Sequence, residues 1–169
     1  MFMTAETRMR QRQRRGNAAG LVACLLILGC AYALEWYVGM EPCPLCHVQR
    51  WVFMALGVVF LAGFLHGAAY WGRFIYAGLA VMVAGAGMGV SGRHLYLQSL
   101  PPDQVPACGP GLEYMLDTFG LMETFSMLVS GAGECAEVDA ILGVTLPAWS
   151  LAGYGLLAVW ALLMTRTPR

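Results

Sequence analysis

The sequence predicts an all-α membrane protein, an antiparallel four-helix transmembrane bundle that forms a single domain over residues 1–169. Of these residues, 59% are hydrophobic and only 12% are charged, whereas charged residues make up about a quarter of ordinary soluble domains. Four continuous apolar runs each approach the ~20 residues that a helix needs to cross a bilayer. They lack the alternation of transmembrane strands. The runs are 17–34, 45–65, 73–92 and 146–164.

The charges orient this bundle. Basic residues favour the cytoplasmic side of a membrane, and most of the arginines flank the runs on one side: Arg8, Arg10, Arg12, Arg14, Arg15, Arg73, Arg166 and Arg169. Every acidic residue except Glu6 lies in or beside the other two connections, about 35–46 and 93–145. Both termini are therefore expected in the cytoplasm and both of these loops outside. The net charge of zero gives no reason to expect a nucleic-acid partner.

The first run, 17–34, follows the arginine-rich start and is expected to remain in the protein as a transmembrane helix rather than to be cleaved as a signal peptide. Ala31-Tyr32-Ala33 imitates the cleavage site of a secretory signal, but the run is longer than the usual apolar region of about 7–15 residues. Cys24 and Cys30 lie within it and point in directions about 120° apart on a helix. We interpret them as small hydrophobic residues.

The second run opens with Cys43-Pro44-Leu45-Cys46 and carries Arg50 one helical turn later. A C-x-x-C pair lowers a thiol pKa and keeps a second thiol beside the reactive one. We expect the Cys46 sulfur near unpaired N–H groups at the positive end of the helix, which favours its thiolate. Arg50 lies on the same face as Cys46. Its guanidinium either pairs with that thiolate or an anionic ligand oxygen, or extends to lipid phosphate.

The third run, 73–92, is rich in glycine (Gly78, Gly85, Gly87, Gly89 and Gly92), which predicts close approach of neighbouring helices. His94 follows at its outer end. Two interpretations stay open for His94: packing at the membrane interface, or a hydrogen bond to a ligand carbonyl at the depth of Arg50.

The long outer segment separates the third and fourth runs and holds Cys108 and Cys135. Four prolines make its first part irregular, and residues 112–129 then predict a short amphipathic helix that lies on the membrane surface or packs on the outer ends of the bundle. Pro147 suits the first turn of the fourth span, 146–164.

The four outer cysteines leave several functions open. Disulfides persist on the outer side, so Cys43–Cys46 and Cys108–Cys135 are one structural interpretation. A two-residue loop makes the first a weak staple. Cys43–His47 also reads C-x-x-C-H, the pattern of c-type haem attachment. A Cys₄ zinc site is disfavoured by the wide spacing of Cys108 and Cys135, and no metal is predicted.

In this order, the motifs resemble the disulfide bond formation protein B (DsbB) family over nearly the whole chain. The motifs are Cys43-Pro-Leu-Cys46 with Arg50, Gly92-Arg93-His94, Pro106-Ala107-Cys108, Gly133-Glu134-Cys135-Ala136-Glu137 and Leu146-Pro147-Ala148-Trp149. The resemblance implies an enzyme, a protein-disulfide:quinone oxidoreductase of the bacterial inner membrane. Its expected partners are a periplasmic DsbA-like oxidase, the respiratory quinone pool and the lipid bilayer.

The resemblance also implies roles for the site residues. The reduced DsbA-like protein attacks the Cys108–Cys135 disulfide, and Cys108 enters the mixed disulfide. Cys135 then exchanges with Cys43, and Cys46 reacts with ubiquinone or menaquinone. Arg50 steadies the negative charge that develops on the quinone, and His94 assists. The alternative is a non-enzymatic membrane protein with structural disulfides or a haem at Cys43–His47.

Overall fold

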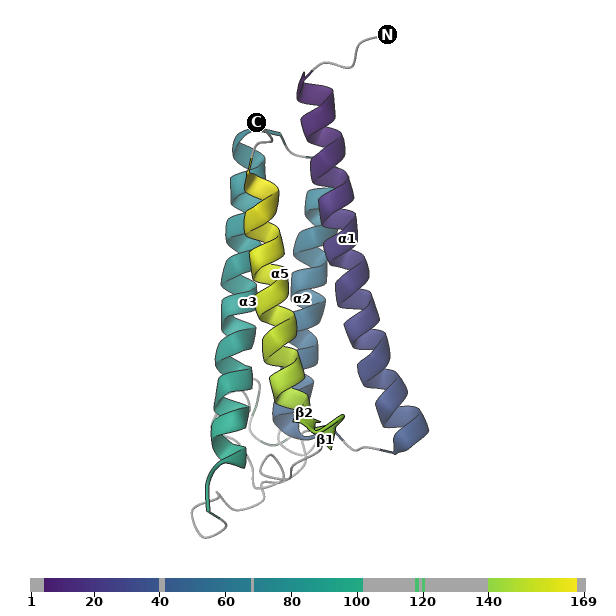
Figure 1. The fold of residues 1–169 in the computed structure, drawn as a ribbon, viewed down its shortest axis with the longest axis vertical. Coiled ribbons are helices and arrows are strands. Elements are labelled where there is room, and N and C mark those ends of the chain that lie inside the picture. Colours follow the sequence, from purple (N-terminus) through teal and green to yellow (C-terminus); the bar gives the residue numbers. More distant parts are fainter. Residues whose placement is uncertain are drawn as a thin grey trace.

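The computed structural model describes residues 5–39, 42–67, 69–101, 118, 120 and 140–166, and four long helices dominate them (Figure 1). The helices are α1 (Ala5–Ala33), α2 (Pro44–His66), α3 (Trp71–Gln98) and α5 (Leu146–Thr165). All four are long and apolar enough to cross a membrane. The prediction of an all-α membrane protein with four spanning helices is confirmed.

The helices pack as a bundle in which α1 contacts α2, α2 contacts α3, and α3 contacts α5 most extensively. The start of α1, the end of α5 and the α2–α3 connection lie at one end (Figure 1). The start of α2 and the end of α3 lie at the other. This second end therefore holds Cys43 and Cys46.

The helices extend beyond the apolar runs. α1 begins well before the predicted span at residue 17 because its polar residues still find partners. Buried Gln13 donates from Nε2 to the Met164 carbonyl oxygen (2.7 Å), and Asn17 donates from Nδ2 to the Gln13 carbonyl oxygen (2.9 Å). At its other end α1 continues into a π-helical turn, Leu34–Val38, where the sequence predicts loop. Gly39 ends that turn with a left-handed φ of 73°.

α3 also continues past its predicted end at residue 92 and reaches Gln98. His94 therefore belongs to a helix, one turn from its end, and its side chain is buried. This placement fixes which way His94 points, which the apolar pattern alone does not.

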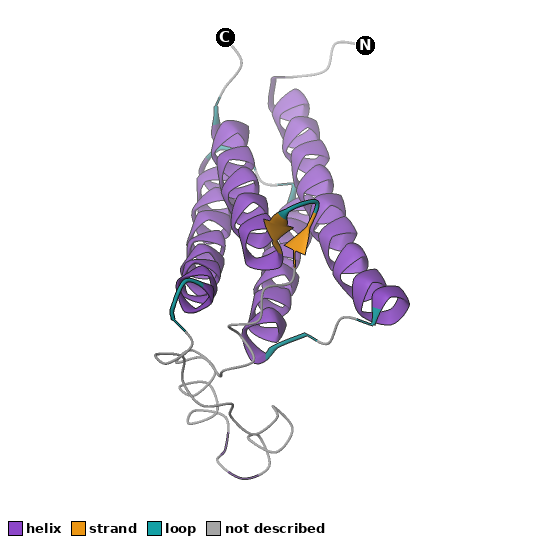
Figure 2. Ribbon diagram, turned by 60° about the horizontal axis from the view of Figure 1, so that its bottom comes forward, coloured by secondary structure: helices purple, strands orange, loops and turns teal. Residues whose placement is uncertain are grey.

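A short antiparallel hairpin precedes α5, and an all-helical prediction does not include it. Its strands are β1 (Ala140–Ile141) and β2 (Val144–Thr145). The turn residues Leu142 and Gly143 both have positive φ, 55° and 78°, as a type I′ hairpin turn requires. Trp149 on α5 donates from Nε1 to the Ile141 carbonyl oxygen (3.3 Å). The hairpin lies beside the start of α5 (Figure 2).

The remaining part of the long connection includes the amphipathic helix predicted at 112–129. Except for Thr118 and Gly120, that segment lies outside the described residues. Cys108 and Cys135 lie outside them as well.

Alanines, more than glycines, bring α3 close to its neighbours. Ala77, Ala80 and Ala84 are buried in the core with Cys24. Of the five glycines in the third run, only Gly87 has another side chain within 4 Å of a would-be Cβ, while Gly78, Gly85, Gly89 and Gly92 face open space. The prediction that these glycines serve close packing therefore holds for Gly87 alone.

Gly87 lies against the ring of Tyr154, and this contact supports the site. The Tyr154 ring stacks on Phe53 with centroids 4.0 Å apart, and its hydroxyl donates to the Gln49 carbonyl oxygen (2.7 Å). Because a Cβ at Gly87 would lie 2.5 Å from Tyr154 Cζ, any larger residue must displace a ring that holds the first turns of α2.

We expect Gly87→Ala to destabilise the protein by about 1–3 kcal/mol, the usual cost of overpacking. Gly89→Ala is the matched control, since nothing lies within 4 Å of its would-be Cβ and alanine is the better helix former. Thermal unfolding in detergent would compare the two. Equal midpoints for both variants would contradict the close contact between Gly87 and Tyr154.

Candidate functional site

The first turn of α2 brings two thiols together. Cys43 is the N-cap, Pro44 occupies the first helical position, and the Cys43 Sγ accepts a hydrogen bond from the Cys46 backbone N–H at 3.4 Å. The Sγ atoms of Cys43 and Cys46 are 3.1 Å apart, a contact between two thiols rather than a covalent bond. Both residues are partly exposed, so soluble reactants can reach them.

This arrangement differs in one respect from the sequence-based expectation. The helical N–H group that was expected beside the Cys46 sulfur instead contacts Cys43. The positive end of α2 therefore favours a thiolate at the N-cap residue Cys43. The two sulfurs are adjacent but face different surroundings.

Cys43 lies beside His94 of α3. The His94 Nε2 is 3.7 Å from the Cys43 Sγ, and the other ring nitrogen, Nδ1, is 3.2 Å from Nε2 of Gln49. His94 and Gln49 are 2% and 3% exposed. Because the Gln49 side chain fixes the ring plane, Nε2 stays directed toward the cysteine pair. The sequence analysis did not identify Gln49 as a site residue. The only indication in the sequence is that Gln49 is a polar residue next to Arg50 inside an apolar run.

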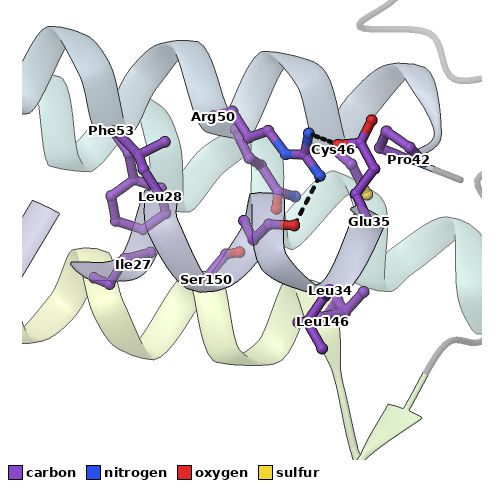
Figure 3. A pocket seen from close by; sticks show the side chains of 12 residues that line it. Ile27, Leu28, Leu34, Glu35, Pro42, Cys46, Arg50, Phe53, Leu146 and Ser150 are labelled. Atoms are coloured by element: carbon purple, nitrogen blue, oxygen red, sulfur yellow. Dashed lines mark hydrogen bonds and ion pairs between the residues drawn. The ribbon is translucent and has the colours of Figure 1, made fainter. Parts of the chain in front are cut away.

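Cys46 lies on the other side, at the wall of a small pocket of about 80 Å³ between α1, α2 and α5. Figure 3 shows Cys46, Arg50 and Glu35 gathered at one end of this pocket and Phe53, Leu28 and Ile27 at the other. The pocket thus combines a thiol, a guanidinium and an apolar wall.

Arg50 points into the protein rather than toward lipid phosphate. Its side chain is only 11% exposed and forms an ion pair with Glu35, whose own side chain is 38% exposed. Its Nη2 also donates to the Ala31 carbonyl oxygen at 3.3 Å, and its guanidinium lies 4.7 Å from the centre of the Tyr32 ring. A cation held so firmly at membrane depth is expected to serve a function.

Glu35 is the second residue that sequence reasoning missed. It lies in the π-helical turn that extends α1, a segment predicted as loop, so no helical register linked it to Arg50. An ionisable residue beside an apolar run was the available signal. Its carboxylate balances the charge of Arg50 and sets where the guanidinium lies.

The structure thus brings together four of the six predicted site residues: Cys43, Cys46, Arg50 and His94. Cys108 and Cys135 are outside the described part of the chain. His47 is not the histidine that faces the thiols; within the described ranges, the ring close to both sulfurs is that of His94.

Chemically, this arrangement suits thiol–disulfide exchange at one sulfur and a ring-shaped, apolar reactant at the other. Cys43 is open to outside thiols and has hydrogen-bond donors for a thiolate. Cys46 faces a pocket whose apolar residues can hold a ring and whose guanidinium can pair with an oxygen of that ring.

Comparison with known proteins agrees with a role in thiol–disulfide exchange. A family model described as disulfide bond formation protein DsbB matches residues 13–164. A relative named disulfide bond formation protein B, from Nitrosococcus oceani, is 46% identical over 145 residues, which cover 83% of this chain and 86% of the relative. A relative of the same name from Hahella chejuensis is 47% identical, and the alignment covers 85% of this chain and 88% of the relative. One from Chromohalobacter salexigens is 44% identical, and the alignment covers 85% of each chain. No solved structure matches the chain.

Proposed function

The chain belongs to the DsbB family of disulfide bond formation proteins, and from this premise we propose that it is a quinone-dependent thiol oxidase that reoxidises a DsbA-like partner. Family membership makes it a disulfide oxidoreductase. The observation that carries the finer proposal is the division of the thiol pair. Cys46 shares an apolar pocket with Arg50, while Cys43, 3.1 Å away from Cys46, lies outside that pocket beside His94.

The electron route starts at the long outer connection. The partner's thiolate attacks the Cys108–Cys135 disulfide, with Cys108 in the mixed disulfide, and Cys135 leaves as a thiolate. Cys135 then attacks Cys43 of the Cys43–Cys46 disulfide, and Cys46 is released as the leaving thiolate. The partner's second thiol attacks the mixed disulfide, which releases the oxidised partner and frees Cys108. Cys108 then attacks Cys135 of the Cys135–Cys43 disulfide, which restores Cys108–Cys135 and leaves Cys43 and Cys46 as a dithiol that holds the two electrons.

Such exchange favours an attacking thiolate and a leaving thiol of low pKa. The helix end favours a thiolate at Cys43, whereas at Cys46 it is Arg50, which lines the same pocket, that would stabilise the leaving thiolate. His94 lies beside the Cys43 sulfur and assists the thiol–disulfide exchange at this cysteine.

The donor set of the pocket fits a quinone. Ile27, Leu28 and Phe53 would contact the ring, and Arg50 would donate to a carbonyl oxygen. A bound ubiquinone or menaquinone would supply a two-electron acceptor that is confined to lipid. Arg50 would stabilise negative charge on that oxygen, and Glu35 keeps the guanidinium in place until then. The small pocket admits a ring, and a long lipid tail would extend into the bilayer.

The location follows from the same chemistry. The protein is a multi-pass membrane protein, and we propose the bacterial inner membrane with both termini in the cytoplasm. The arginine-rich start of α1 and the end of α5 share one end of the bundle, as the positive-inside rule requires for that orientation. Cys43 and Cys46 then face the periplasm, where disulfides persist.

Anaerobic mixing of the purified protein with a reduced DsbA-type donor tests the proposal. We expect one quinone reduced for each donor dithiol oxidised, followed by quinone absorbance, and no steady turnover without quinone. Cys108→Ser should stop electron flow from the protein donor. Sustained donor oxidation in the absence of quinone would refute the proposed acceptor.

A further inference from the structure

Three metal-binding atoms meet at the outer end of the bundle. The Sγ of Cys43, the Sγ of Cys46 and a ring nitrogen of His94 all lie within 4.8 Å of one another. The cysteines come from the start of α2 and the histidine from the last turns of α3. No motif in the sequence links His94 to the pair, because the contact depends on the relative register of two helices.

We propose that the dithiol form of this enzyme binds Zn²⁺ through Cys43, Cys46 and His94, and that the bound ion inhibits it. Two thiolates and one imidazole form a ligand set typical of zinc, with a fourth position left for water. The inference rests on the proposed function only in that each catalytic cycle generates the dithiol.

The observed distances need little adjustment. With Zn–S near 2.3 Å and Zn–N near 2.0 Å, a tetrahedral site separates its sulfurs by about 3.8 Å and each sulfur from the nitrogen by about 3.5 Å. The corresponding distances are 3.1 Å between the sulfurs and 3.7 Å from Cys43 Sγ to His94 Nε2. The Cys46 sulfur lies within 4.8 Å of the His94 ring nitrogen, so a rotation of this partly exposed side chain has to widen the first distance and bring the Cys46 sulfur closer to His94.

Gln49 supports the proposed site by contacting the His94 ring nitrogen that faces away from the sulfurs. A histidine that binds zinc through one nitrogen usually donates its other N–H to a fixed acceptor. His94 Nδ1 already lies 3.2 Å from the Gln49 carboxamide, and both side chains are buried. If the Gln49 amide flips by about 180°, its oxygen accepts a hydrogen bond from Nδ1–H of His94. The lone pair of His94 Nε2 then points toward the two sulfurs.

Charge balance also favours the ion. Binding releases one proton from each thiol, so Zn²⁺ and two thiolates form a neutral group. The nearby Arg50 is neutralised by Glu35 and does not repel the ion strongly. No electrons move in this step. Because both sulfurs are then bonded to the metal, neither can form the Cys43–Cys46 disulfide or attack another reactant until the metal leaves.

The test uses the full chain with Cys108→Ser and Cys135→Ser, reduced chemically under anaerobic conditions, so that only the α2 pair supplies two adjacent thiols. Cd²⁺ serves as a spectroscopic probe through its thiolate charge-transfer absorption, and Zn²⁺ competes with it. We expect one ion per chain, two protons released, and no binding after oxidation of Cys43–Cys46. X-ray absorption of the zinc form should show two sulfur and at least one imidazole ligand.

Substitutions separate this site from a simple dithiol. His94→Gln should weaken binding at least about tenfold, and Gln49→Leu should weaken it in the same direction, as loss of outer partners does. His66→Gln is the matched control, because His66 lies at the opposite end of α2 against Tyr76. Unchanged affinity in His94→Gln, a zinc shell without imidazole, or equal binding by the oxidised protein would each overturn the proposal.

Discussion

Cys46→Ser should reduce quinone reduction by at least about a thousandfold, the scale of loss when a covalent nucleophile is removed. Serine has nearly the same shape, so the first turn of α2 and the pocket wall should persist. Its hydroxyl, however, neither ionises near neutral pH nor forms a disulfide with Cys43. The loss should therefore appear in turnover rather than in folding, and anaerobic quinone absorbance measures it directly.

Cys30→Ser is the control for this variant. Cys30 is exposed on α1 and has no part in the proposed electron route, so its replacement should leave the turnover rate unchanged. If Cys46→Ser kept a tenth or more of the wild-type rate, Cys46 could not be the sulfur that delivers electrons to the acceptor.

A second measurement distinguishes Cys46 from Cys43, since either substitution stops the cycle. With Cys43 replaced by serine, the thiol that remains in the pair lines the pocket, and a bound quinone should slow its alkylation. With Cys46 replaced, the remaining thiol at Cys43 faces His94, and quinone should protect it little. Equal protection in the two variants would mean that the pocket does not separate the sulfurs.

The fold could be predicted from the sequence because hydropathy and charge act along the chain. Four apolar runs of sufficient length leave helices as the natural spanning structure. The exact helix ends could not be predicted, since they depend on partners elsewhere. Gln13 is tolerated inside the bundle only because the Met164 carbonyl lies opposite. The turn after α1 persists because Glu35 pairs with Arg50.

The site was predictable in its residue types and less so in its pairings. The C-x-x-C motif and Arg50 are local in sequence, so their shared helix face follows from helical geometry. Contacts between helices depend on register and rotation that no local pattern encodes. For this reason the sequence left His94 open between packing at the membrane interface and a ligand contact at the depth of Arg50, and it did not predict the contacts of His94 with Cys43 and Gln49. Neither Gln49 nor Glu35 was identified as a site residue.

Arg50→Gln should raise the apparent KM for quinone by about 10- to 100-fold. A hydrogen bond from a charged donor contributes about 1.5–3 kcal/mol when its loss leaves a partner unsatisfied, and each 1.4 kcal/mol is tenfold in affinity. Glutamine keeps a polar group in the pocket but has neither the charge nor the reach of the guanidinium. Steady-state rates at varied quinone concentration, with saturating donor, measure this change.

Glu35→Gln gives the matched comparison, because it removes the charge that holds Arg50 while leaving the guanidinium itself. If Arg50 binds the quinone oxygen directly, Glu35→Gln should raise KM much less than Arg50→Gln, since the released guanidinium can still turn toward the pocket. If the ion pair serves only to fasten the end of α1 to α2, both variants should weaken quinone binding equally. That second result would remove Arg50 from the quinone site and leave the pocket without a charged donor for the acceptor.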